Sequence, residues 1–408
     1  MTQTWSGLAN SPNWDLDKSR TAWYNCTRVQ SSMTSCLAWT FFHHLGCTRV
    51  QGVRIMPRVS IKDIAREAGV SHSTVSRALS DSPLVSAETK LRIQHLARVM
   101  GYSPDAQARS LVMGRTQTIG VVVTTLADPF IAEIVQAIES TALDEGYSVI
   151  LASSNSEPER EIAAVQMLRS KRVDGLVVTS SRVGALYQEH LDRLGVPVVL
   201  VNSHSEQSGP YTYSIDVDNR HGAWLGTGHL IQLGHRRIAY VTGASEHSDD
   251  LERLAGYRQA LQEAGIAFDR ALVILGTGRV DGGEEALPLL MALDEPPTAV
   301  FCYNDMTAIG LLGAARKARL SIPCDLAVVG FDDIPFASYV QPPLTTVAQP
   351  KPKMGKMAME MVLALMADGD DNARSISNVA VQGRLIVRES SGGRVHPTED
   401  KLLGDGGL

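Results

Sequence analysis

The chain has 408 residues, 44% of them hydrophobic and 20% charged, and its formal net charge is −6. This composition is typical of a globular protein large enough for more than one domain and a sizeable core. No run of about 18 apolar residues occurs, so the sequence predicts no membrane span.

The charge is divided unevenly along the chain. The stretch Pro57–Arg115 holds nine Lys/Arg against five Asp/Glu, whereas residues 116–408 hold 24 Lys/Arg against 37 Asp/Glu. A basic head on an acidic body is typical of a small polyanion-binding module joined to a part that does not bind nucleic acid.

Residues 1–56 differ in composition from the rest and show no clear periodicity. They contain three of the five cysteines and four of the five tryptophans. We interpret this segment as a disordered extension, or as a start assigned too far upstream, with Met56 as the true start. An export signal around Cys36–Phe42 would take the protein away from DNA, and a metal site from His43, His44 and Cys47 fits no zinc spacing.

The remaining cysteines, Cys302 and Cys324, lie far apart in the body. Two scattered cysteines favour a reducing compartment without a disulfide framework, and we therefore expect a cytoplasmic protein.

Residues 57–104 carry the signals of a helix–turn–helix domain. Ser60–Asp63 has the form of a capping box, so a helix should begin near Ile61 and end at Gly69. Ser71 can cap a second helix that extends to about Leu79. Two short helices joined by a glycine-containing turn form a helix–turn–helix, whose second helix enters the major groove of DNA.

A third helix should follow, capped by Ser86 and ended by Gly101. The apolar spacing of the three helices predicts one small core, with these side chains pointing inward: Ile61, Ile64, Ala65, Ala68, Val75, Ala78, Leu79, Leu91, Leu96, Ala97 and Met100.

The outer face of the second helix has the chemistry to read bases. Arg77 can donate two hydrogen bonds to guanine, and His72 and Ser73 can bond to base edges. Thr74 and Ser76 suit phosphate oxygens, and Ser71 at the helix start is also counted among the predicted DNA contacts. The alternative is that these residues are only the solvated face of a helix.

Residues 105–116 should form a short hinge helix and a linker. The helical stretch has about two turns, too few to be stable alone. It carries Arg109 and an exposed Leu111, a combination suited to the minor groove, where an apolar side chain can unstack a base step.

Four segments of this region resemble the lac-repressor (LacI/GalR) family of bacterial transcription factors: Val59–Ala65, Gly69–Ser71, Thr74–Leu79 and Ala108–Leu111. The resemblance covers about residues 58–390. It implies that His72, Ser73 and Arg77 read bases, that Leu111 is the minor-groove wedge, and that a homodimer binds a palindromic operator. Asp105 departs from the neutral residue common in the family, which puts its contact with DNA in doubt.

Beyond the hinge, short apolar runs alternate with amphipathic segments. This alternation predicts a periplasmic-binding-protein-like α/β body of two doubly wound parallel-sheet lobes, with a ligand cleft at the strand ends. We expect an N-terminal lobe of residues 117–218 and 349–377, a C-terminal lobe of residues 219–348 and 378–391, and a disordered tail at 392–408. The predicted strands are Ile119–Thr124, Ser148–Ala152, Gly175–Thr179, Val198–Val201, Ile238–Thr242, Val300–Tyr303 and Ala327–Phe331.

Polar side chains follow these strands where such a cleft would need them. Asp and Asn can bond to adjacent hydroxyls, Arg supplies several donors, and an aromatic ring can cover an apolar face of a sugar. For Arg253 and Asp332 the alternative is a role in a structural salt bridge. From the residues and the family motif we predict these effector contacts: Phe130, Asn202, Arg253, Asn304 and Asp332.

Two features bear on the effector. Ile131 stands where purine-binding family members place an aromatic ring, which argues against a stacked purine. The stretch Gly276–Gly283 lacks the aromatic residue of many sugar-binding relatives, and Arg279 within it could meet an acidic group or be a solvated loop charge. We take a sugar or a sugar acid as the working hypothesis.

No catalytic or cofactor motif is complete. Gly276–Gly278 does not extend to a dinucleotide fingerprint, and Gly243–His247 lacks the last glycine of a nucleophile elbow. The sequence therefore predicts a transcriptional regulator, most simply a repressor, with no cofactor and no enzymatic activity. A periplasmic-type sugar-binding protein and a sugar-processing enzyme are the alternatives, because the body fold alone does not specify function.

Overall fold

The computed structural model describes residues 59–102, 110, 114–179, 195–203, 212–243, 248–367 and 378–392. The chain divides into two compact units, Met1–Ser103 and Pro104–Leu408. Within the described residues, no helix has the length and apolar character needed to span a membrane.

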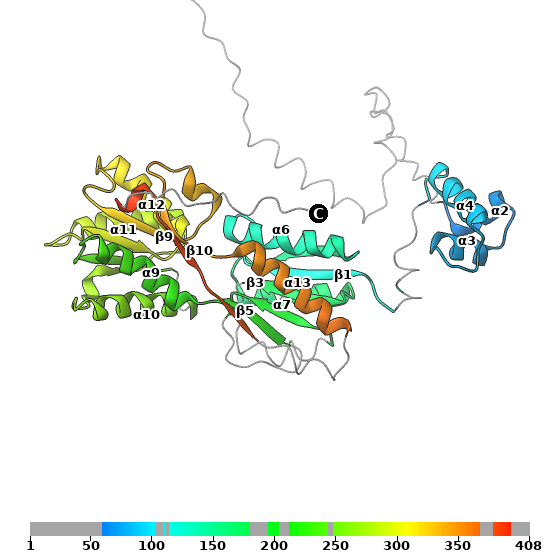
Figure 1. The fold of residues 1–408 in the computed structure, drawn as a ribbon, viewed down its shortest axis with the longest axis horizontal. Helices are drawn as coiled ribbons and strands as arrows, with labels where there is room; N and C mark the ends of the chain where they lie inside the picture. The colour runs from blue at the N-terminus through cyan, green and yellow to red at the C-terminus, as the bar shows by residue number, and fades with distance from the viewer. Residues whose placement is uncertain are drawn as a thin grey trace, which may run out of the picture. The chain divides into compact units, whose positions relative to one another are not determined.

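The described part of the first unit, residues 59–102, contains three helices, α2 (Ile61–Ala68), α3 (His72–Leu79) and α4 (Ala87–Val99) (Figure 1). The capping box of Ser60 and Asp63 is present, and α2 ends at Gly69, whose φ of 64° places it in the left-handed region. The Ser71 hydroxyl caps α3 by accepting a hydrogen bond from the Thr74 amide at 3.1 Å. The predicted helix starts are therefore confirmed.

The core of this unit corrects one prediction about α4. Leu91 is 65% exposed, whereas Ile93 is fully buried. Residues two positions apart in an α-helix are separated by roughly 200° around its axis, so only one of Leu91 and Ile93 can face the core. Ile93 and Ala97, four residues apart, form the buried stripe, with Leu96 and Met100 packed partly beside them.

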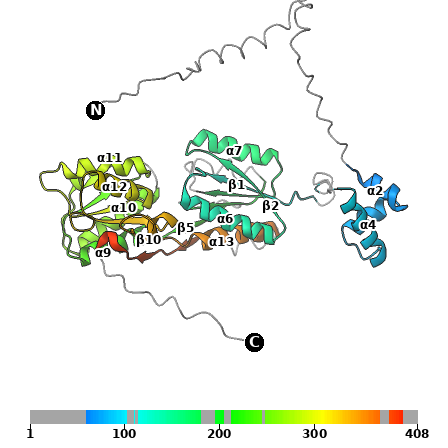
Figure 2. The ribbon, with the colours of Figure 1, turned by 90° about the horizontal axis from the view of Figure 1, so that it is seen from above.

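The second unit contains two six-stranded sheets, and we call each sheet with its helices a lobe (Figure 2). The sheet of the first lobe has the order β11-β5-β4-β3-β1-β2, and all its strand pairs are parallel. Its strands are β1 (Thr118–Val123), β2 (Ser148–Ser153), β3 (Gly175–Thr179), β4 (Val198–Val201), β5 (Thr212–Val217) and β11 (Val379–Val381).

Helices cover both faces of this first sheet. α6 (Pro129–Asp144) and α13 (Lys351–Ala367) lie side by side on one face, and α7 (Pro158–Ser170) packs on the other. At Gly355 a Cβ atom would lie 2.4 Å from the Ile134 carbonyl oxygen, so glycine allows the close approach of α13 to α6.

The sheet of the second lobe has the order β12-β10-β9-β8-β6-β7, and only β12 is antiparallel to its neighbour. Its strands are β6 (Ile238–Val241), β7 (Val273–Ile274), β8 (Ala299–Cys302), β9 (Ala327–Asp332), β10 (Thr345–Ala348) and β12 (Arg384–Ile386). Its longer helices are α9 (Asn219–Gln232), α10 (Ser248–Glu263), α11 (Val280–Met291) and α12 (Asp305–Lys317), and its short 3-10 helices are η2 (Arg270–Leu272), η3 (Pro335–Ser338) and η5 (Glu389–Ser391).

All seven predicted strands are present within a residue or two of their expected ends, and the two doubly wound, mainly parallel sheets confirm the predicted fold class. Helices α11 and α13 and the strands β5, β7, β10, β11 and β12 were not singled out from the sequence.

The described chain passes between the lobes after β5, after β10 and after β11. The third passage corrects the expected boundary at residue 378. β11 pairs with β5 in the first lobe, and only β12 belongs to the second. Pairing with β11 satisfies backbone groups that β5 would otherwise leave unpaired at the sheet edge.

Candidate functional site

The outer face of α3 presents the side chains predicted to read DNA. His72, Ser73, Ser76 and Arg77 are exposed, while Thr74 is half-buried. The Ser71 hydroxyl lies 2.8 Å from both the Ser73 hydroxyl and the Thr74 hydroxyl. Ser71 and Thr74 therefore use part of their hydrogen-bonding capacity to begin the helix, and Arg77 and His72 carry the polar groups most accessible to a partner.

The predicted hinge contacts Arg109 and Leu111 lie outside the described residues, as do Asp105 and the His43, His44 and Cys47 cluster. The minor-groove roles of Arg109 and Leu111 stay predictions.

In the second unit, a cleft of about 1120 Å³ lies between the lobes at the carboxyl ends of their strands. All five predicted effector residues line it, together with polar groups from both lobes. The lining includes Thr124, Asp128, Phe130, Asn155, Ser156 and Asn202 from the first lobe, and Asp249, Arg253, Arg279, Tyr303, Asn304 and Asp332 from the second.

Arg253 lies at the base of the cleft and is only 2% exposed. Its Nε donates to Asn219 Oδ1 at 2.9 Å and its Nη1 to the Tyr303 carbonyl oxygen at 2.5 Å. Its Nη2 lies 3.8 Å from Asp332 Oδ1. The guanidinium also stacks 3.9 Å from the centroid of the Phe331 ring. Nη2 is thus the part of Arg253 with most capacity left for a ligand.

Asp332 ends β9, and its carboxylate accepts a hydrogen bond of 2.6 Å from Gln349 Nε2. Burial raises the pKa of Asp332 to about 7, and the Asp128 carboxylate adds to that rise, while Arg253 and Lys351 oppose it. Near neutral pH the group can therefore accept a hydrogen bond as a carboxylate or donate one as an acid.

Asn304 has a structural role that the sequence did not reveal. Its Oδ1 caps α12 by accepting from the Thr307 amide at 2.9 Å, and its Nδ2 donates to the Gly278 carbonyl oxygen at 2.9 Å. This asparagine fastens the 277–281 loop to the start of α12, so a ligand can use only its remaining amide proton.

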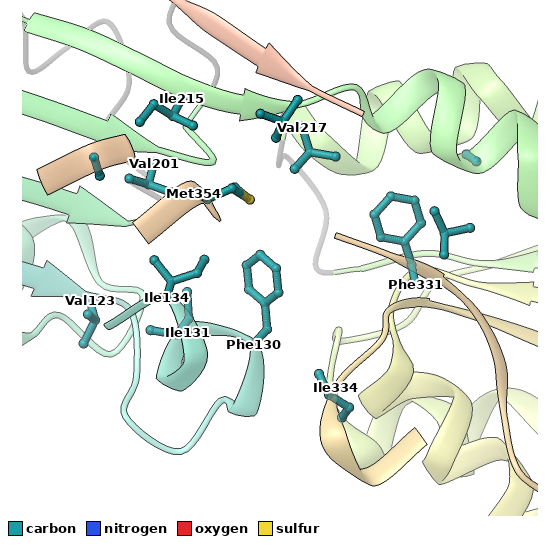
Figure 3. Packing of buried hydrophobic residues seen from close by; sticks show 14 of the residues in the cluster. Val123, Phe130, Ile131, Ile134, Val201, Ile215, Val217, Phe331, Ile334 and Met354 are labelled. Atoms are coloured by element: carbon teal, nitrogen blue, oxygen red, sulfur yellow. The ribbon is translucent and has the colours of Figure 1, made fainter. Parts of the chain in front are cut away.

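Phe130 and Asn202 complete the predicted set. Phe130 is 5% exposed and packs in the core beside Ile131, Ile134 and Met354 (Figure 3). It also belongs to the cleft lining. Asn202 follows β4 with a φ of 53°, in the left-handed region that asparagine tolerates better than most residues.

Several lining residues were not predicted from the sequence. The Tyr303 hydroxyl donates to Asp249 Oδ2 at 2.6 Å, and burial together with this carboxylate raises the pKa of Tyr303. Asn155 and Ser156 both have positive φ values, 52° and 61°. All three residues lie at or just beyond the ends of predicted strands, a signal that could have identified them.

Two arguments about the effector change with the structure. Ile131 is 1% exposed, belongs to the core, and is not part of the cleft lining, so its identity gives no ground for excluding an aromatic ligand. Tyr303 supplies an aromatic side chain that the 276–283 stretch lacks. Arg279 is exposed at the cleft rim.

A helix–turn–helix unit joined to a two-lobed body with a polar cleft defines a ligand-responsive DNA-binding regulator. Residues 60–105 match the model of bacterial regulatory proteins of the lacI family, and residues 227–391 match that of the periplasmic binding protein-like domain. The chain belongs to the lacI family of transcriptional regulators, with a DNA-binding head and an effector-binding body. This finding supports the regulator over the periplasmic solute-binding alternative.

Curated relatives include the HTH-type transcriptional repressor PurR of Vibrio atlanticus (strain LGP32), 37% identical over 77% of this chain and 94% of the relative. PurR of Proteus mirabilis (strain HI4320) is 35% identical over 81% of this chain and 96% of its own length. Among solved structures, the lac repressor dimer bound to operator and the anti-inducer ONPF has a TM-score of 0.74 at 28% identity. That match covers 82% of this chain and 99% of the other. The complex of the regulator CelR with cellobiose has a TM-score of 0.59 at 31% identity, covering 82% and 100%.

Proposed function

We propose that the protein is a homodimeric, cytoplasmic repressor without enzymatic activity, and that a neutral sugar bound in the cleft controls its affinity for a palindromic operator. The observation that carries the effector class is the pairing of Arg253 with Asp332 at the base of a polar cleft. Together they offer donors and acceptors close enough to meet adjacent hydroxyl groups.

The charges of the lining favour a neutral sugar over a sugar acid. Among the residues that the structure describes, six acidic side chains and two arginines line the cleft. An anionic ligand would meet more carboxylates than guanidinium groups, and like charges in a partly dehydrated cleft repel strongly. Two of the solved relatives carry neutral sugars, cellobiose in CelR and ribose in a LacI family regulator of Enterococcus faecium.

Thermodynamic linkage explains how a sugar in the cleft can change the affinity for the operator. A sugar that contacts both lobes binds more tightly when they are closed on it, so it shifts the population toward the closed arrangement. If the two arrangements hold the DNA-binding heads of a dimer differently, sugar and operator affect each other's affinity by the same factor.

A thermal-shift screen of D-ribose, cellobiose, D-glucose and D-gluconate, each with the full chain, tests the effector class. We expect at least one neutral sugar to raise the unfolding temperature in a saturable way, and gluconate to do so less. Operator selection from a random duplex library should return a palindrome. The absence of any saturable shift with the neutral sugars would refute the effector class, and selection without a palindromic consensus would refute the dimeric reading of DNA.

A further inference from the structure

Lys351 is a buried charge that the effector cleft itself does not explain. It is 3% exposed and lies at the start of α13, directly after the chain passes from β10 of the second lobe to the first. A lysine is almost never fully buried unless its ammonium group is paired.

The ammonium group of Lys351 reaches back to the second lobe. Its Nζ donates to the carbonyl oxygens of Asp332 and Asp333, each at 2.6 Å. Both aspartates have positive φ values, 111° and 51°, in the region that non-glycine residues avoid. Because a side chain is sterically disfavoured there, most of all at the φ of 111° of Asp332, such a conformation persists only where the surroundings hold it. Lys351 stabilises both conformations by its hydrogen bonds to the two carbonyl oxygens.

The same ammonium group faces the first lobe. Glu133 Oε1, on α6, lies 3.6 Å from Lys351 Nζ. This oxygen is buried and forms no hydrogen bond among the described residues, so the lysine supplies compensating charge. Since α6 and α13 pack closely at Gly355, Lys351 and Glu133 belong to one helix pair.

Gln349, between β10 and α13, contacts the same aspartate. Its Nε2 donates to Asp332 Oδ1 at 2.6 Å, while its own Oε1 is buried without a hydrogen-bond partner in the described part of the chain. An amide can turn to present a donor to a carboxylate or an acceptor to a carboxylic acid. Gln349 is therefore suited to both protonation states of Asp332.

We propose that Lys351, assisted by Gln349, is the positioning residue of the cleft: it holds Asp332 in its strained conformation and fastens the second lobe to α6 of the first. This proposal rests on the proposed function only in taking Asp332 as an effector contact. A displacement of Asp332 on effector binding would then be transmitted through Lys351 to α13 and α6.

The electrostatic surroundings of Asp332 define what else acts on it. The charged and titratable groups that face it are Arg253 from α10, Asp128 from the start of α6, Lys351 from α13, Asp305 from the start of α12 and Tyr303 after β8. Its neighbour Asp333 is paired with Arg388 at 2.7 Å. Of these groups, Lys351 is the one that binds the Asp332 backbone as well as influencing its carboxyl group.

Hydrogen–deuterium exchange of the full chain, without any sugar, tests whether Lys351 holds the Asp332 segment against α6. We expect Lys351→Met to speed exchange at least tenfold in the peptide spanning residues 331–335 and in the α6 peptide spanning 130–134. Lys353→Met, an exposed lysine on the same helix, should change neither, and Lys351→Arg should restore most of the protection. Unchanged exchange in Lys351→Met, or a change confined to one lobe, would overturn the proposal.

Gln349→Leu and Glu133→Gln serve if Lys351→Met does not fold, because both leave the ammonium group in place. Removal of the Gln349 donor should raise the pKa of Asp332, so Gln349→Leu should lose more stability at pH 8 than at pH 5. Glu133→Gln should speed exchange in the 130–134 peptide. If Gln349→Leu lost the same stability at both pH values, as a loss of packing alone would give, the result would count against the positioning role. Unchanged exchange in Glu133→Gln would count against it as well. A wild-type chain that bound no sugar would refute the proposed function and leave these readouts unaffected.

Discussion

The head and the body of this protein build their functional surfaces in opposite ways. The predicted reading face of α3 comes from six residues within the short segment 71–77, on one helix and its N-cap. The cleft brings together side chains from Thr124 to Asp332 on two sheets. A local surface depends on helix formation and a small core, whereas a cleft of this kind depends on the whole tertiary arrangement. The two regions should therefore fail separately.

The largest expected effect is loss of the head alone. Val75 is fully buried in the small core of the first unit, and a domain of this size has little stability to spare. Val75→Asp buries an unpaired charge, so the head should unfold and operator binding should disappear. Calorimetry should show the unfolding transition of the body unchanged. A lowered body transition would show that the two units are not independent, and Val99→Asp, at an exposed position of α4, is the control.

The second experiment impairs the body and leaves the head intact, by replacing the buried arginine of the cleft. Arg253→Met leaves Asp332 and Asp249 without their buried cation, and breaking a buried charge network costs about 3–5 kcal/mol. We expect the body to be destabilised and the sugar-induced thermal shift to be lost. The variant's helix–turn–helix should still bind operator at a temperature where the body remains folded. Arg258→Met, on the same helix but exposed, controls for loss of charge.

We expect the body to lose stability as the pH rises, because of the buried Asp332. Because the pKa of Asp332 is raised to about 7, well above an unfolded value of about 3.9, its contribution to stability is complete below pH 4 and is lost as the pH rises through 7. Between pH 5 and pH 8 this loss is about 3 kcal/mol. Urea unfolding should show a shallower loss in Asp332→Asn than in the wild type. Identical slopes for the two proteins would contradict the raised pKa.

A smaller effect is expected on the reading face. Arg77→Ala should cost about 1–3 kcal/mol of operator affinity and relax specificity at one base pair, with the body unchanged. Arg98→Ala, exposed near the end of α4, is the matched control. Gel-shift titration against single-base operator variants measures both. Equal losses on every sequence would assign Arg77 to phosphate contact instead of base reading.

Prediction from the sequence was accurate where the cause is local. The Ser60–Asp63 capping box and the turn at Gly69 depend on side chains within a few residues, and the apolar strands are visible as short runs. Leu91 was misplaced because Leu91 and Ile93 are both apolar, and only the packing of α4 against α2 and α3 decides which of the two is buried. Asn304 was identified as part of the cleft, but its bond to Gly278 joins residues 26 apart, which no local pattern records.

The sequence by itself determined that a helix–turn–helix head precedes a two-lobed α/β body, because caps, turns and hydrophobic periods act over a few residues. Only the tertiary structure decided that β11 returns to the first lobe, that Tyr303 lines the cleft, and that Lys351 reaches across to the Asp332 backbone. These features depend on segments far apart in the chain meeting in space. Burial then fixes which polar groups must pair, and that requirement appears only once the lobes have formed.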